Sequence, residues 1–141
     1  MKISLKTVQN NIKKLLRNLN KTLKPECIIL YGSFARGDYN ERSDIDIIVI
    51  SSQLPKNFYN RMQFLYDLIE SYEAIDILGY TPYEFKHMLE KRHCTSLFAM
   101  EEGIPLYGKK LFKELKEIFD NTIEKYQLTK TSSAWVPLFL D

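Results

Sequence analysis

Two aspartates inside an apolar segment are the residues of this sequence best placed to do chemistry. Asp44 and Asp46 lie in the run 44–50, whose other members are isoleucine and valine. That composition predicts a buried strand, in which alternate side chains point to the same face. The two carboxylates therefore face one way, with Cα atoms about 7 Å apart. Because like charges repel and buried acids need a partner, a divalent cation such as Mg²⁺ would relieve the cost of this pair.

A third acid, Asp76, lies in a second apolar run that predicts a strand over residues 74–80. If this strand neighbours the first, its carboxylate joins the same pocket; the alternative is an acid at a loop edge. Three acids could hold two Mg²⁺ ions about 3.5–4 Å apart, the separation found in two-metal phosphoryl-transfer sites. One ion would then activate the attacking oxygen, and the other would hold a triphosphate and its leaving pyrophosphate.

Gly32 and Ser33 directly follow another predicted buried strand, over residues 27–31. A glycine at this point lets the backbone approach a phosphate closely. If Ser33 opens a helical turn, its N–H groups would point at the anion. These two residues are therefore candidates for binding a phosphate group.

Arg36 lies in the same loop and could pair with a phosphate oxygen through two hydrogen bonds. A surface salt bridge with Asp38 or Glu41 is the competing interpretation. The loop is not a Walker A motif, because no Gly-Lys-Ser/Thr follows, and the sequence contains no G-x-G-x-x-G.

The spacing of apolar residues in the rest of the chain predicts the helices and strands that position these residues. Helical spacing of apolar residues predicts helices over 5–23, 58–69, 82–89, 97–102 and 109–126. Thr81, Pro82 and Glu84 form the expected start of one helix, a capping box with proline at the first position. Gly103 is expected to end another helix, and residues 104–107 are expected to form an edge strand. Helices and strands alternate, which indicates an α/β or α+β domain with helices packed on one small sheet.

Composition limits the classes of function. The chain has 141 residues and a formal net charge of +2, which indicates one domain and gives no reason to expect a nucleic-acid or membrane partner. The first residues lack the apolar run of a signal peptide, and no apolar stretch approaches about 20 residues, so we expect a cytoplasmic protein. Cys27 and Cys94 are far apart and predict buried free thiols rather than a zinc site.

Three segments together resemble a known family. Residues 32–38 (GSFARGD) and 43–49 (SDIDIIV) resemble the G-S-x10-D-x-D motif of the minimal nucleotidyltransferases (MNT) of the DNA polymerase β superfamily. The Asp76 strand with its following helix, and residues 102–108 (EGIPLYG), resemble later elements of that family. The resemblance covers roughly residues 5 to 125. It implies the nucleotidyltransferase fold, a small mixed sheet of three to five strands flanked by helices, with a minimal domain over residues 1–126.

Within the family, chains of this length resemble the antitoxin half of HEPN/MNT toxin–antitoxin pairs. The resemblance implies a Mg²⁺-dependent enzyme that transfers AMP from ATP to a tyrosine of a HEPN ribonuclease toxin. Carried over by position, Gly32 and Ser33 would bind the nucleotide's phosphates and Arg36 would steady the triphosphate. Asp44 and Asp46 would bind two Mg²⁺ ions, and Asp76 would complete the metal site and help deprotonate the attacking hydroxyl.

Two alternatives to this function remain open. One is a nucleotidyltransferase that modifies a small hydroxyl compound such as an antibiotic, and the other is a non-catalytic module that inhibits its partner by binding. The tail, residues 127–141, shows no periodicity and ends in apolar groups. It either folds back to cap the domain or docks on a partner through Trp135.

The sequence leaves the oligomeric state open, and both a homo-oligomer and a hetero-oligomer are possible.

Overall fold

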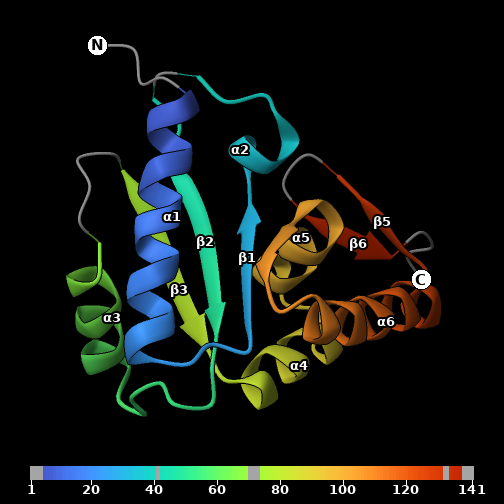
Figure 1. Ribbon diagram of the computed structural model, residues 1–141. Coiled ribbons are helices and arrows are strands. Elements are labelled where there is room, and N and C mark those ends of the chain that lie inside the picture. Colours follow the sequence, from blue (N-terminus) through green and yellow to red (C-terminus); the bar gives the residue numbers. More distant parts are fainter. Residues whose placement is uncertain (1–4, 41, 70–73, 132–133, 138–141) are drawn as a thin grey trace.

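The computed structural model describes residues 5–40, 42–69, 74–131 and 134–137, which form a four-stranded sheet flanked by helices (Figure 1). The strand order is β3-β2-β1-β4, with β1 antiparallel to both β2 and β4, and β2 parallel to β3. This is the mixed sheet that the resemblance implied. The strands are β1 (Cys27–Tyr31), β2 (Ile45–Ile50), β3 (Ile75–Tyr80) and β4 (Ile104–Tyr107).

The helices cover the two faces of this sheet. Alternate strand residues divide into two buried clusters, one packed against α1 and α3 and the other against α4, α5 and α6. In Figure 1, α1 crosses one face of the sheet. This two-sided burial explains why β1 and β2 are apolar along nearly their whole length. The helices are α1 (Leu5–Thr22), α2 (Ser33–Arg36), α3 (Phe58–Asp67), α4 (Pro82–Glu90), α5 (Cys94–Glu102) and α6 (Lys109–Tyr126).

The predicted capping box at the start of α4 is present. The Thr81 hydroxyl accepts a hydrogen bond from the Glu84 N–H at 3.1 Å, and Glu84 Oε1 accepts from the Thr81 N–H at 2.7 Å. The same Oε1 also accepts from Nη1 of the buried Arg61 at 2.8 Å. The cap therefore also joins α4 to α3.

Gly103 ends α5 as predicted. Its backbone is extended, with φ −71° and ψ 151°. A Cβ on Gly103 would meet the Ala99 carbonyl oxygen and, at 2.7 Å, Cγ2 of Ile29. Close packing of the helix end on β1 is therefore the reason for this glycine. The helix also begins earlier than predicted, at Cys94, because its first turn is polar and carries no apolar periodicity.

The tail contains two strands that the sequence pattern did not predict. β5 (Leu128–Lys130) and β6 (Trp135–Pro137) pair antiparallel, and Thr131 and Ala134 hydrogen bond across the connection. Strands of three residues are too short to show a period. Trp135 lies with its ring centroid 5.8 Å from Phe119 and 6.4 Å from Phe98, so the described part of the tail folds back onto α5 and α6. The apolar residues 138–140 lie outside the described residues.

The cysteines only partly follow the expectation. Both thiols are free, but Cys27 is buried whereas Cys94 is exposed, because Cys94 begins α5 at the surface. Across the described ranges, none of the helices has the length and apolar character needed to cross a bilayer.

Candidate active site

Strands β2 and β3 bring two of the three acids side by side. Asp46 and Asp76 are register partners in the parallel pair, so their side chains project from the same face. Asp44 stands two residues before Asp46, just before β2 begins. Asp46 is half-buried, whereas Asp44 and Asp76 are exposed. The acids thus lie at the end of the sheet where β2 and β3 both start.

The pKa of Asp46 reflects its burial and the nearby acids. Burial raises the pKa of Asp46 to about 6, and the negative charges of Asp76 and Asp44 add to the increase, while Arg36 opposes it. A carboxylate with this environment gains from any cation placed between it and its neighbours. Exposed carboxylate oxygens are also the ligands that Mg²⁺ prefers, because this ion keeps several waters and takes only one or two carboxylates from the protein.

The three acids do not form a closed set of metal ligands. Among the described residues, no three His, Cys, Asp or Glu side chains are grouped closely enough to hold an ion. Oδ1 of Asp76 instead accepts a hydrogen bond from the Tyr66 hydroxyl at 3.3 Å. The donor chemistry of the acids fits a divalent cation, and Asp46 and Asp76 are the pair that the sheet holds together.

The Gly32 turn lies directly against Asp46. Gly32 follows β1, whose last residue Tyr31 is the register partner of Asp46 in β2. It has φ 75°, and a Cβ at this position would clash with the Asp46 carboxylate. Glycine is therefore required here both by backbone conformation and by space. Ser33 then begins α2, the single helical turn expected in this loop.

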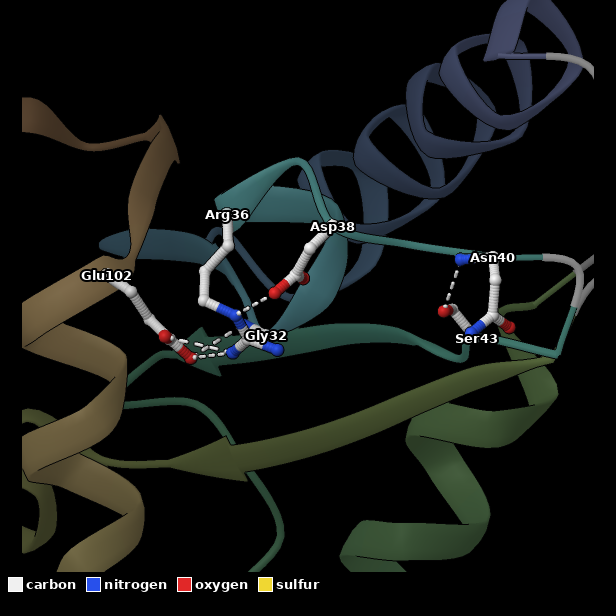
Figure 2. Close-up of polar contacts among 6 residues, drawn as sticks. All are labelled: Gly32, Arg36, Asp38, Asn40, Ser43 and Glu102. Atoms are coloured by element: carbon white, nitrogen blue, oxygen red, sulfur yellow. Dashed lines mark hydrogen bonds and ion pairs between the residues drawn. The ribbon is translucent and has the colours of Figure 1, made fainter. Parts of the chain in front are cut away.

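Arg36 is paired with two carboxylates (Figure 2). Its Nη1 donates to Oε1 and Oε2 of Glu102 at 2.8 and 2.9 Å, and its Nε donates to Oδ2 of Asp38 at 3.2 Å. The salt-bridge interpretation of Arg36 therefore describes the observed geometry, with Asp38 as one of its partners. Glu41, the other acid considered, lies outside the described residues.

Glu102 is the residue of this region that sequence reasoning missed. Besides binding Arg36, its Oε1 accepts a hydrogen bond from the Gly32 N–H at 3.2 Å (Figure 2). Glu102 stands at the start of the segment 102–108 that carries the family resemblance, but nothing local indicates that it reaches a residue 70 positions earlier. Only the packing of α5 beside β1 brings the two together.

A cavity of about 360 Å³ opens beside the turn. Tyr31 and Phe98 give it aromatic walls, and Gly32, Arg36 and Glu102 give it polar groups. In the loop that leads into Asp44, the Asn40 N–H donates to Oγ of Ser43 at 2.8 Å (Figure 2). The region thus combines the paired acids Asp46 and Asp76, a close-approach glycine turn and a cavity beside that turn.

The family model described as "Polymerase beta, Nucleotidyltransferase" matches residues 10–110. The matched range includes the Gly32 turn and all three aspartates. The chain therefore belongs to the polymerase beta nucleotidyltransferase family.

Two relatives and one solved structure are similar to this chain. Two proteins of Methanocaldococcus jannaschii, both named "Putative protein adenylyltransferase", align with part of this chain. MJ0141 is 39% identical over 46 residues, which are 31% of this chain and 46% of that protein. MJ1379 is 40% identical over 70 residues, which are 47% of this chain and 67% of that protein. The chain thus spans about half the length of the first of these relatives. A crystal structure described as a toxin–antitoxin with AMP-PNP shares the fold, with a TM-score of 0.52 and 21% identity over 83% of this chain and 87% of that one.

Proposed function

We propose that this protein transfers AMP from ATP to a hydroxyl group in a Mg²⁺-dependent reaction. The observation that carries the proposal is the contact between the Gly32 turn and Asp46, with Asp76 beside it in register. A turn that admits a phosphate next to paired carboxylates is the arrangement that phosphoryl transfer needs, because its catalysis is mostly positioning and charge stabilisation.

Each residue of the site has a defined task in this reaction. Asp44, Asp46 and Asp76 are the residues that would hold Mg²⁺, which when bound would supply positive charge to the triphosphate and lower the pKa of the attacking hydroxyl. Gly32 and Ser33 bind phosphate oxygens through the turn.

The acceptor oxygen forms a bond to the α-phosphorus, and the bond from the α-phosphorus to the oxygen bridging to the β-phosphate breaks. Pyrophosphate leaves with that electron pair, and Asp76 takes the hydroxyl proton. The in-line geometry of this exchange follows from phosphoryl-transfer chemistry in general.

Arg36 has a changed role in this proposal. Its guanidinium already binds Glu102 and Asp38, so it steadies the triphosphate only from within that ion-pair network. We therefore expect Arg36→Ala to weaken ATP binding more mildly than loss of an aspartate impairs transfer.

The acceptor we favour is a protein hydroxyl, specifically a tyrosine of a HEPN ribonuclease toxin. Support comes from the adenylyltransferase names of the relatives, from the toxin–antitoxin described for the fold neighbour, and from the motif resemblance. In this role the protein is an antitoxin that acts in the cytoplasm.

The test uses ATP labelled on the α-phosphate, with Mg²⁺ or with a chelator, and a HEPN ribonuclease encoded beside this chain as acceptor. We expect label on the ribonuclease only with Mg²⁺, and none from γ-labelled ATP, which excludes phosphorylation. Label on small hydroxyl compounds alone would assign the protein to the antibiotic-modifying class. Inhibition of the ribonuclease without any label would make the protein a non-catalytic binding module.

A further inference from the structure

Glu102 places a carboxylate within hydrogen-bond distance of the turn that contacts Asp46. Its side chain is only 10% exposed, and its two oxygens accept three hydrogen bonds, one from the Gly32 N–H and two from Arg36. A nearly buried carboxylate is stable only when hydrogen-bond donors satisfy it. Here the donors are Gly32, just before α2, and Arg36, the last residue of α2. Glu102 therefore ties the turn to α5.

The end of α5 that carries Glu102 is itself held firmly. Leu97, Ala99 and Met100 are buried, and Gly103 packs too closely on Ile29 of β1 to admit a Cβ. Glu102 thus extends from a fixed point next to β1, the strand that leads into Gly32. Side chains on rigid elements hold a partner more accurately than side chains on loops.

Gly32 is consequently held from two sides. The Asp46 carboxylate lies where a Cβ of Gly32 would be, and Glu102 accepts the hydrogen bond from the Gly32 N–H. A shift of the turn relative to α5 would break the hydrogen bond between the Gly32 N–H and Glu102. The spacing between the phosphate-binding turn and the carboxylates is therefore controlled by α5.

We propose that Glu102 is a positioning residue that holds the Gly32 turn at the distance from Asp46 needed for AMP transfer, a role that rests on the function proposed above. A negative charge beside a triphosphate reduces its electrostatic attraction, so charge alone gives no reason for an acid here. Its value lies in the hydrogen bonds that it accepts.

The kinetic test compares Glu102→Ala with Glu102→Gln, which keeps an acceptor oxygen for the Gly32 N–H. In the alanine variant kcat should fall at least about tenfold, because misplacing reacting groups by an ångström is costly, while KM for ATP rises only a few-fold. The glutamine variant should restore kcat to within about threefold of the wild type, since the hydrogen bond is retained. Glu101→Ala, on the exposed neighbour in α5, is the control.

Two kinetic outcomes would overturn the proposal. If Glu102→Ala leaves kcat and KM unchanged, the contact does not position the turn. If it lowers KM for ATP without lowering kcat, the carboxylate competes with phosphate for the turn instead of positioning it.

Hydrogen exchange of the Gly32 amide, followed by NMR without nucleotide, tests the contact without relying on activity. We expect exchange to be at least about tenfold faster in Glu102→Ala than in the wild type or Glu101→Ala, because a lost acceptor exposes the N–H. Unchanged exchange refutes the proposed contact. Faster exchange in a protein that transfers no AMP even as wild type refutes the proposed function and leaves Glu102 as a holder of the turn.

Discussion

Asp46 illustrates how a single residue carries both a cost to folding and a capacity for chemistry. Its carboxyl is half-buried beside two other acids, and burial with their negative charges raises its pKa to about 6. In the unfolded chain the pKa returns to its ordinary value of about 4. The folded state therefore binds the Asp46 proton more tightly than the unfolded state does.

The sign of the resulting pH dependence is definite. Asp46 contributes no penalty below about pH 4, where both states bind its proton. The penalty grows between about pH 4 and pH 6, where only the unfolded carboxyl is ionised, and it is constant above about pH 6. In chelator at pH 7, Asp46→Asn should raise the free energy of unfolding by about 1 kcal/mol, a value reduced from the full shift because the group is partly solvated.

Urea unfolding at pH 7 and at pH 4 measures this effect, with Asp120→Asn on the exposed face of α6 as control. The gain should vanish at pH 4. An Asp46→Asn variant that is less stable than the wild type at pH 7 would contradict the interpretation.

Under the proposed function, both Asp44 and Asp46 should be indispensable for activity. Asp44→Asn or Asp46→Asn should reduce AMP transfer at least about a thousandfold, because each change would remove a ligand of the proposed Mg²⁺ ion, whose charge would stabilise the transition state. Circular dichroism should show an intact fold in both variants. Near-full activity in either one would rule out the two-metal assignment.

Gly32 and Gly37 offer a matched pair of substitutions. Both have positive φ, 75° and 89°, but a Cβ on Gly32 would clash with the Asp46 carboxylate, whereas one on Gly37 would meet no described atom within 4 Å. Gly37→Ala should cost about 1 kcal/mol of stability, and Gly32→Ala about 3 kcal/mol together with loss of ATP binding. Thermal unfolding and nucleotide titration separate the two effects; equal behaviour of the two variants would mean that the Gly32 contact has no importance.

At the scale of elements, α3 and α4 are joined through one ion pair. Arg61 is buried with 6% of its side chain exposed, and Glu84 provides its carboxylate partner at 2.8 Å. Burial alone would raise the pKa of Glu84, but hydrogen bonds from the Thr81 N–H and Arg61 outweigh it and lower that pKa. The stabilisation from Glu84 is therefore present above its ordinary pKa and is lost as pH falls through the lower folded value.

Glu84→Ala should reduce the free energy of unfolding by about 2 kcal/mol at pH 7, because it opens the capping box and leaves the Arg61 charge without a partner. Glu84→Gln should cost less, since glutamine also completes a capping box. Denaturant unfolding gives both values, with Glu90→Ala at the exposed end of α4 as control. If glutamine and alanine cost the same, the cap contributes nothing beyond the charge.

At the scale of the whole molecule, the tail hairpin packs on α5 and α6 through Trp135. Trp135 is the single tryptophan of the chain, and it packs against Phe98 of α5 and Phe119 of α6. Its indole N–H is buried without a hydrogen-bond partner among the described residues, so its contribution is that of an apolar ring. Folding back and capping the domain is the reading that these contacts favour for the described part of the tail.

Trp135→Ala should lower the free energy of unfolding by about 2 kcal/mol, less than for a fully buried tryptophan because the ring is only half-buried. Trp135→Phe should cost less than about 1 kcal/mol, since it keeps the ring contacts and removes the unpartnered N–H. In the wild type, tryptophan fluorescence and circular dichroism should report the same urea midpoint. A fluorescence change that precedes loss of helix would show that the hairpin is not part of the cooperative domain.

The sequence predicted correctly those elements that depend on neighbouring residues, and it missed those that depend on residues far away in the chain. The strand of residues 27–31 and the helix of residues 109–126 were predicted at their observed bounds, and the box of Thr81 and Glu84 was predicted with its partners. Each of these depends on neighbours within a few positions. The hairpin of the tail was missed, because its strands are too short for a pattern and its stability comes from Trp135 on distant helices.

The amino-acid sequence alone predicted the four strands of the main sheet, the five longer helices and the glycine that precedes α2, because burial periodicity and backbone conformation are local properties. Only the tertiary structure decided that Asp46 and Asp76 are in register and that Glu102 binds both Gly32 and Arg36. The physical reason is that register and side-chain pairing between segments up to 70 positions apart depend on how the helices pack on the sheet.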